Sequence, residues 1–286
     1  MLSTDLVLVS GKGGTGKSAV ASAIAIERAR RGQTVLAIDL GNGLGLGAHL
    51  RARHLTYKPV EVRAGLYAMT MERTAALDEY FKKQLHMPQG APTKPIAGAL
   101  SVLVDAAPGV REIISIGKPV HELWQGTWDA VIVDTPSLGQ FRSYLRAPMT
   151  ISELAPTGAV GRQASALAEV LADAGTTRVV LVTNPAELPV IETREMLEHI
   201  REEQLCPAPS VVMNRMLTPA SFDDSDLNSL PTGPLRAAGV HQLSMERSQA
   251  EWATNVDADA TLPFLRGVLT PGEVAVQLAD AIGTIV

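Results

Sequence analysis

An eight-residue glycine-rich stretch near the amino end constrains this chain more than any other feature. Residues 11–18 read GKGGTGKS and fit the pattern G-x-x-x-x-G-K-[ST]. An apolar run, DLVLVS, precedes the stretch, and an Ala- and Ile-rich helical pattern over residues 18–31 follows it. A strand, a glycine loop and a helix in this order predict a loop whose backbone N–H groups wrap a phosphate. The alternative is a chance glycine-rich turn, which the flanking strand and helix argue against.

The side chains of this loop indicate what it binds. Lys17 can place its ammonium group on the β- and γ-phosphates of a nucleotide, and the Ser18 hydroxyl can ligate Mg²⁺. Because glycines carry no Cβ atom, the backbone can close around phosphates without a clash. We therefore expect ATP and Mg²⁺ as cofactors. The loop residues expected to hold the nucleotide are Gly11, Gly13, Gly14, Thr15, Gly16, Lys17, Ser18 and Ala19.

Apolar runs alternate with helical patterns along the rest of the chain. Further strands are expected at residues 34–40, 128–134, 178–183 and 210–214, and helices at 158–173 and 188–204. Such alternation predicts an α/β fold, with a mostly parallel sheet and helices on both faces. Two stretches are longer than one crossover needs. We therefore expect a single domain, 1–286, whose helical insertions at about 72–125 and 217–261 form a helical subdomain on one side of the sheet.

Composition narrows the possible function classes. Lys and Arg number 25 and Asp and Glu 30, so the net charge is −5 and nucleic-acid binding is not expected. Cys206 is the only cysteine, which excludes an intrachain disulfide and a zinc, iron–sulfur or metalloid site built from several cysteines of one chain. The start shows no signal-peptide pattern, and no apolar run approaches roughly 20 residues. We expect a cytoplasmic protein whose contact with membranes is only indirect.

Lys12 makes the glycine loop more specific. The form K-G-G-x-G-K-[ST] resembles the deviant phosphate loop of the MinD, ParA and ArsA class of dimeric P-loop ATPases. The resemblance implies that Lys12 reaches across a dimer interface and stabilises charge on the phosphoryl group at the partner's nucleotide. A solvated loop lysine is the alternative.

A second motif resembles one branch of that class. Residues 134–148, DTPSLGQFRSYLRAP, are similar to the signature D-T-A-P-T-G-H-T-L-R-x-L-x-x-P of ArsA-like ATPases. The segments VTNPAE and ETR, at 182–187 and 192–194, resemble the family's V-T-x-P-E-x-L-x-x-x-E-T, and VVMNR at 211–215 resembles V-V-x-N-[RQ]. The chain is most similar to the short, single-copy ArsA-like proteins of bacteria, which are often encoded and assembled as pairs.

The resemblance implies roles for four further residues. Asp134 would hold Mg²⁺ through water, and the Gly139 N–H would contact the γ-phosphate. Asp39 would position or deprotonate the attacking water, while Asn214 would read the adenine edge. A helix or loop cap is the alternative for the aspartates and for Asn214. The expected catalytic residues are Lys12, Lys17, Asp39 and Asp134, the expected metal ligands Ser18 and Asp134, and the expected nucleotide contacts outside the loop Gly139 and Asn214.

The chain departs from the family pattern around Asp39. The family has D-P-A-H-N, whereas this chain has D-L-G-N-G at residues 39–43. Ala19 also stands where the family often has Thr, and Leu138 replaces a polar residue. The charged parts of the site are retained. We therefore expect ATP binding, with slow hydrolysis.

The function implied by the resemblance is a dimeric, ATP-hydrolysing switch. The chain would pair with itself or with a similar chain, and its nucleotide state would drive capture and release of a protein client, such as a hydrophobic or membrane-targeted segment. Two alternatives stay open at this point. One is a positioning ATPase of the ParA or MinD type, and the other is a poorly hydrolysing nucleotide-binding subunit of a hetero-oligomer.

Overall fold

The computed structural model describes residues 5–72, 74–76, 78–79 and 109–282 of the chain. The helices in these ranges are α1 (Lys17–Arg30), α2 (Leu44–Leu50), α5 (Val110–Gln125), α6 (Leu138–Leu154), α7 (Ala159–Ala172), α8 (Glu187–Glu203), α9 (Asp224–Ser229), α10 (Pro234–Ala253) and α11 (Pro271–Ile282). None of these described helices is both long enough and apolar enough to cross a membrane.

Eight strands form one twisted sheet in the order β3-β4-β2-β5-β1-β6-β7-β8. Their bounds are β1 (Asp5–Gly11), β2 (Val35–Asp39), β3 (Val60–Arg63), β4 (Leu66–Thr70), β5 (Ala130–Asp134), β6 (Thr177–Thr183), β7 (Ser210–Met216) and β8 (Ala260–Pro263). All neighbouring pairs are parallel except β3 and β4, which are antiparallel. The predicted α/β fold with a mostly parallel sheet is confirmed.

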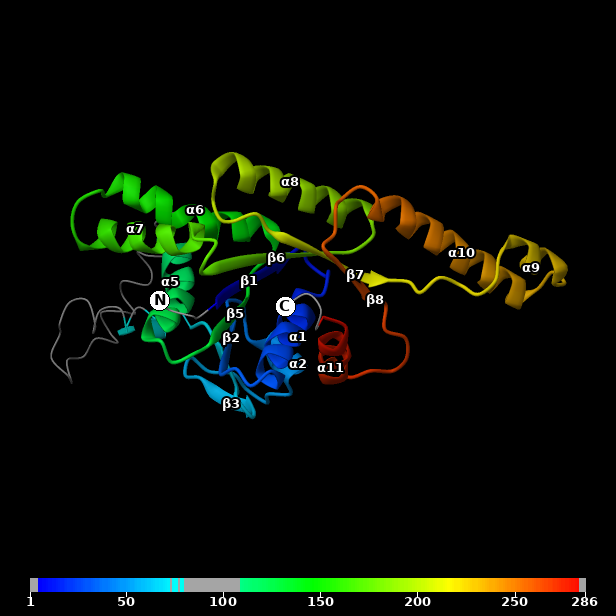
Figure 1. The fold of residues 1–286 in the computed structure, drawn as a ribbon, viewed down its shortest axis with the longest axis horizontal. Coiled ribbons are helices and arrows are strands. Elements are labelled where there is room, and N and C mark those ends of the chain that lie inside the picture. Colours follow the sequence, from blue (N-terminus) through cyan, green and yellow to red (C-terminus); the bar gives the residue numbers. More distant parts are fainter. Residues whose placement is uncertain (1–4, 73, 77, 80–108, 283–286) are drawn as a thin grey trace.

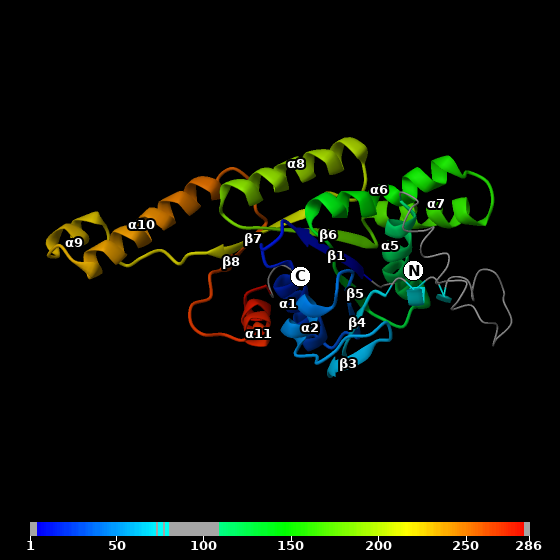
Figure 2. The ribbon, with the colours of Figure 1, turned by 180° about the vertical axis from the view of Figure 1, so that it is seen from behind.

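Helices cover both faces of the sheet, as the alternation of strands and helices predicts (Figure 1). Helices α1, α2 and α11 lie on one face, and α5, α6, α7 and α8 lie on the other, which the reverse view in Figure 2 also shows. Two large apolar clusters fill the space between the sheet and these layers. In β1 the side chains alternate between them: Leu6 and Leu8 join one cluster, and Val7 and Val9 join the other.

The strands expected from the sequence are β1, β2, β5, β6 and β7, which form the centre of the sheet. Strand β5 begins two residues later than expected and β7 ends two residues later. Strands β3, β4 and β8 were not expected from the sequence, and they lie at the two ends of the sheet. These strands are short, and most side chains of β3 and β8 are at least partly exposed, so their apolar signal is weak.

The described helix α5 of the first expected insertion and helices α9 and α10 of the second lie far apart along the sheet (Figures 1 and 2). In the first, α5 packs directly on β5 and β1, while residues 80–108 fall outside the described part of the chain. In the second, α9 and α10 extend past β7 and β8, with α10 packed against α8. A helical subdomain that joins both insertions therefore stays a prediction.

Candidate functional site

The glycine loop lies where β1 ends and α1 begins, as its sequence predicts. Gly14 and Gly16 have φ angles of 88° and 97°, a left-handed region that favours glycine. A Cβ atom at Gly11 would lie 2.2 Å from the carbonyl oxygen of Val182 on β6. The Thr15 hydroxyl donates to the Lys12 carbonyl at 2.9 Å and closes the loop on itself. Gly14 and Gly16 are therefore favoured by the backbone path, and Gly11 is required by its packing against β6.

Two buried aspartates stand side by side at the edge of the sheet that faces this loop. Asp39 ends β2, Asp134 ends β5, and the two residues are direct partners in the register of these parallel strands. Only 4% of Asp39 and 6% of Asp134 are exposed. The carboxyl ends of the strands are where open α/β sheets bind ligands. The structure thus brings both expected carboxylates to the expected place.

The environment of this pair favours the protonated form of the carboxyls. Burial raises the pKa of Asp134 to about 7; the charge of Asp39 adds to this, and the Ser18 hydroxyl and Lys17 oppose it. Burial also raises the pKa of Asp39, against the N–H groups that point at it, including that of Gly41 at 2.6 Å. Two adjacent buried carboxylates are costly until a cation joins them.

One carboxylate oxygen of Asp134 has no hydrogen-bond donor among the described residues. This atom, Oδ1, is buried. The Ser18 hydroxyl hydrogen-bonds the same carboxyl group. Gly45 of α2 covers the spot, since a Cβ atom there would lie 2.6 Å from the Ser18 Oγ. A carboxylate oxygen and a hydroxyl suit Mg²⁺, which also keeps waters and phosphate oxygens as ligands.

A cavity of about 500 Å³ opens above this pair of aspartates. It brings Ser18, Asp39 and Asp134 together, and residues from α5 and α6 form its other wall. Sequence reasoning did not single out that wall, because its members come from separate elements with no common motif. The wall residues are Arg111, Ser115, Gln140 and Tyr144.

A second cavity of about 450 Å³ lies on the other side of the glycine loop. The predicted residues Gly14, Gly16, Lys17, Ser18, Ala19 and Asn214 line it. Apolar residues after β8 complete the lining, among them Phe264, Leu265 and Leu269. A phosphate loop beside an apolar wall can take a nucleotide, with the base against the wall. Nothing in the sequence LPF at 262–264 indicates that it lies beside the phosphate loop.

Asn214 binds the glycine loop itself. Its Nδ2 donates to the Thr15 carbonyl oxygen at 2.8 Å, and its Oδ1 accepts from the Arg215 N–H at 2.9 Å. The approach is close, since a Cβ atom at Gly16 would lie 2.4 Å from that Nδ2. Asn214 therefore fixes the shape of the loop from β7, in addition to lining the second cavity.

Lys12 is held within its own chain. Its Nζ forms an ion pair and hydrogen bond with Oε1 of Glu192 on α8. Lys12 lines neither of the two cavities, whereas Lys17 lines the second and acts electrostatically on both aspartates. Gly139 lines neither cavity, although it lies in the first turn of α6 beside Gln140. The Lys12 side chain thus contacts α8, whereas Asp39 and Asp134 share the first cavity.

The fold and the site together define a class of protein. A glycine loop between the central strand and its helix, facing carboxylates at the ends of two neighbouring parallel strands, is the arrangement of a P-loop NTPase. Residues 4–157 match the family described as anion-transporting ATPase. The chain belongs to this ArsA family, binds ATP and is an ATPase.

Three named relatives illustrate the match. The chain is 30% identical to the ATPase BagA of Mycobacterium tuberculosis, over 96% of this chain and 83% of that protein. It is 26% identical to the ATPase get3 of Schizosaccharomyces japonicus, over 51% of this chain and 45% of that one. It is 23% identical to the ATPase GET3 of Chaetomium globosum, over 51% and 44% of the two chains.

Proposed function

We propose that this ATPase is a nucleotide-driven switch that acts as a dimer with itself or with a similar chain. The observation that carries the proposal is the position of Lys12. This lysine extends from the phosphate loop to α8, apart from the cavities beside its own loop. A loop cation outside its own site can serve the site of a second chain. Lys12 would then stabilise the transferring phosphoryl group in trans.

Residues of the chain's own site would bind the phosphates and take up the proton in the hydrolytic step. Lys17 binds the β- and γ-phosphates, and the Gly139 N–H binds the γ-phosphate. Asp39 accepts a proton from water as the water oxygen bonds to the γ-phosphorus and the bond from that phosphorus to the bridging oxygen breaks. ADP and inorganic phosphate leave. Burial raises the pKa of Asp39, and a carboxylate with a raised pKa is a stronger proton acceptor.

Ser18 and Asp134 would hold Mg²⁺, Ser18 directly and Asp134 through water. The unpartnered Oδ1 of Asp134 and the neighbouring Ser18 hydroxyl support this assignment. The ion would neutralise charge on the β- and γ-phosphate oxygens. Within the described residues, no cluster of three His, Cys, Asp or Glu side chains suits a metal. A site completed by phosphate oxygens fits that composition.

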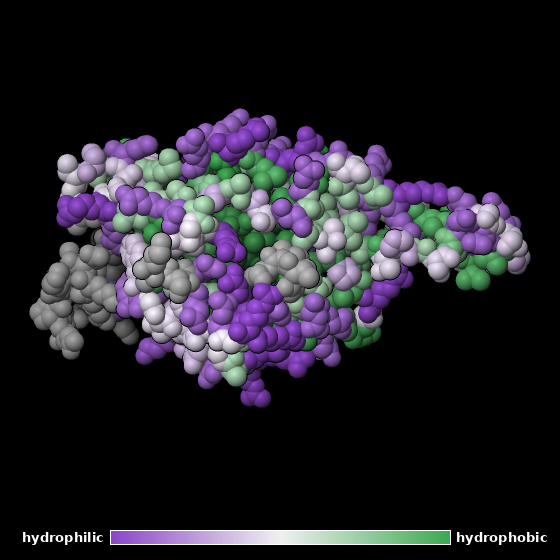
Figure 3. All heavy atoms as spheres, in the orientation of Figure 1, coloured by the Kyte–Doolittle hydropathy of each residue, from purple (hydrophilic) through white to green (hydrophobic). Residues whose placement is uncertain are grey.

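The projecting end of the molecule supports a protein client. In Figure 3, apolar side chains lie among polar ones on the surface formed by α9 and α10. On α10, Leu235 is 72% exposed and Val240 51% exposed. Exposed apolar side chains on a projecting part of the chain can contact an apolar partner segment. The client we propose is a hydrophobic or membrane-targeted segment.

A slowly hydrolysing subunit of a hetero-oligomer is a second candidate, and one contact favours it. Asp39 Oδ1 accepts the N–H of Gly41 at 2.6 Å, inside the loop where the family pattern has changed. That bond occupies an oxygen that would otherwise face water. The family match across residues 4–157 does not favour a positioning ATPase of the ParA or MinD type.

Light scattering after chromatography of the Asp39→Asn variant tests the switch. The variant should form a dimer in Mg-ATP and stay monomeric in Mg-ADP, because hydrolysis can no longer reset it. Lys12→Ala added to it should remove the ATP-dependent dimer while nucleotide binding remains. A monomer under both conditions would refute the homodimeric switch and point to a different chain as the partner.

A further inference from the structure

The first cavity contains one exposed cation that the hydrolytic scheme does not use. Arg111 is the second residue of α5 and lines this cavity together with Asp39, Asp134 and Ser18. Its side chain is exposed, and no ion pair to it occurs among the described residues. Ser115, one turn along α5, donates its hydroxyl to the Arg111 carbonyl at 2.9 Å and also lines the cavity. The guanidinium is therefore available to a ligand.

The negative charges at the cavity favour an additional cation such as the Arg111 guanidinium. The triphosphate of ATP carries several negative charges, and two carboxylates already stand at the ends of β2 and β5. Lys17 is the loop cation that acts on them, while Lys12 is neutralised by Glu192. A guanidinium binds phosphate oxygens with two parallel N–H donors, which an ammonium group cannot do. Gln140, the other exposed polar side chain on this wall, carries no charge.

We propose that Arg111 binds the terminal phosphate of ATP from the α5 side of the cavity and thereby distinguishes ATP from ADP. This inference rests on the nucleotide site proposed above. It adds a residue that lies outside the glycine loop and outside the signature at residues 134–148. Only ATP carries the terminal phosphate. A contact to this phosphate therefore forms with ATP and is absent with ADP.

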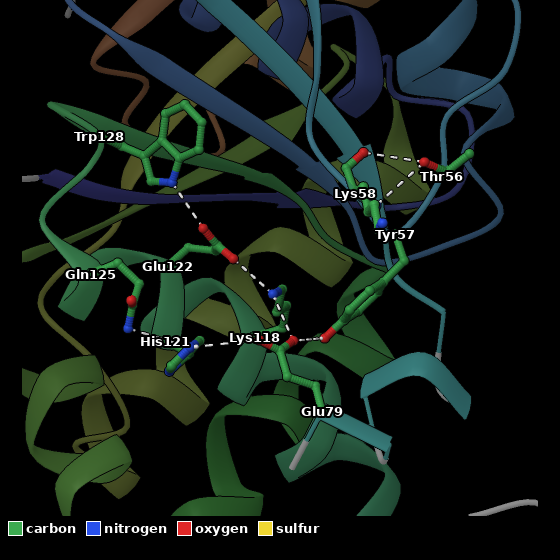
Figure 4. Close-up of polar contacts among 9 residues, drawn as sticks. All are labelled: Thr56, Tyr57, Lys58, Glu79, Lys118, His121, Glu122, Gln125 and Trp128. Atoms are coloured by element: carbon green, nitrogen blue, oxygen red, sulfur yellow. Dashed lines mark hydrogen bonds and ion pairs between the residues drawn. The ribbon is translucent and has the colours of Figure 1, made fainter. Parts of the chain in front are cut away.

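Helix α5 connects this contact to the segment that precedes it. Two turns after Arg111, Lys118 is buried and binds Glu79 at 2.9 Å and Glu122 at 2.7 Å (Figure 4). Its ammonium group also lies 4.7 Å from the centre of the Tyr57 ring. Glu79 follows β4 and stands at the start of the stretch that leads back to α5. Helix α5 thus carries both the proposed phosphate contact and the anchor of the segment around Glu79, about 10 Å apart along its axis.

Equilibrium binding of two nucleotides tests the proposal. We would measure the dissociation constants of Mg-ADP and of a magnesium complex of a non-hydrolysable ATP analogue by calorimetry, for wild type and Arg111→Ala. Loss of a charged hydrogen-bond pair to the terminal phosphate should weaken the ATP analogue on the order of ten- to a hundredfold. Binding of Mg-ADP should stay within about twofold, and Arg111→Lys should recover part of the loss.

The control is Arg162→Ala, which removes an exposed arginine of α7 that lines neither nucleotide cavity. Thermal unfolding of each variant separates a binding defect from misfolding. Equal weakening of both nucleotides, or no change in either, would overturn the role of Arg111. Light scattering measures dimer formation independently of the nucleotide affinities. Selective loss of the ATP analogue in a chain that never dimerises would uphold Arg111 and refute the switch.

Discussion

Lys12 of the phosphate loop and Glu192 of α8 form an ion pair within one chain, although 180 residues separate them. The pair joins the phosphate loop to the helix that connects β6 to β7. If Lys12 acts on a second chain's nucleotide, this bond must break first. On that proposal, Glu192 would set a free-energy cost on dimer formation.

Glu192→Gln should lower that cost. The amide removes the negative charge that holds Lys12, so ATP-dependent dimers should form at a lower protein concentration, by about fivefold or more, as expected for a partly exposed ion pair worth about 1 kcal/mol. Sedimentation velocity in Mg-ATP, in the Asp39→Asn background, measures the shift. Glu195→Gln changes an exposed carboxylate on the same helix and should leave the equilibrium unmoved. If the Glu192→Gln variant dimerises as weakly as its parent, the Lys12–Glu192 ion pair does not oppose dimer formation.

Asp134 should make the stability of the nucleotide-free protein depend on pH. Its pKa rises from 3.8 in the unfolded chain to about 7 in the folded one, chiefly through burial. Between these values the folded chain holds a proton that the unfolded chain has released. The free energy of unfolding therefore falls as pH increases from about 4 to about 7, by up to roughly 4 kcal/mol, and levels off above.

Asp134→Asn should remove most of that pH dependence and raise the melting temperature at pH 8. Differential scanning fluorimetry from pH 5 to pH 8, without nucleotide or Mg²⁺, is the measurement. Asp39, whose pKa burial also raises, should leave a smaller slope of the same sign. In wild type, Mg²⁺ should stabilise the protein more at pH 8 than at pH 5, because the ion competes with the proton. Parallel curves for wild type and variant would count against a protonated Asp134.

Asn214→Ala should weaken both the fold and nucleotide binding. The variant leaves the buried Thr15 carbonyl without the amide donor that lies 2.8 Å away. The expected loss is about 1–2 kcal/mol of unfolding free energy. Asn255→Ala is the matched control, since that amide also donates to a backbone carbonyl, of Glu251, but at the surface. The free energies of unfolding of the two variants, measured in urea, should differ by at least about 1 kcal/mol. Similar midpoints would show that the hydrogen bond from Asn214 to Thr15 does not stabilise the fold.

Lys118→Met should destabilise the chain through the carboxylates it leaves behind. Lys118 is 8% exposed and is the cation that joins Glu79 to Glu122 (Figure 4). Removing one member of a buried charged group costs about 3–5 kcal/mol. Glu122→Gln in the same chain should recover part of this loss, since its amide oxygen can still accept the Trp128 indole N–H. Thermal unfolding of the single and double variants measures this recovery. Equal melting temperatures would show that the charge of Glu122 does not destabilise the Lys118→Met variant.

The centre of the fold was predictable because its signals are local. The glycine loop and the strands beside it combine short apolar runs with a helix start, and each lies within a few neighbouring residues. Asp39 and Asp134 were predictable as residues at the ends of two apolar strands, whereas their direct pairing appears only in the register of β2 and β5. The edge strands β3 and β8 escaped prediction because partly exposed strands show little apolar periodicity.

The missed parts of the site depend on distant pairings. Nothing near Glu192 in the sequence indicates that it meets Lys12, and nothing near Asn214 indicates that it holds the Thr15 carbonyl. Arg111 belongs to no motif, and it reaches the cavity only because α5 packs beside α6. Such contacts follow from how helices pack on the sheet, and a single sequence does not show that packing.

The attachment of α10 to α8 gives the molecule a mechanical property. Helix α10 has 20 residues, so it is about 30 Å long, and its base rests on the helix that carries Glu192. A tilt of α8 by roughly 10° would swing the tip of such an arm by about 5 Å. A small tilt of α8 would thus move the exposed Leu235, near the tip of α10, by about the length of a side chain.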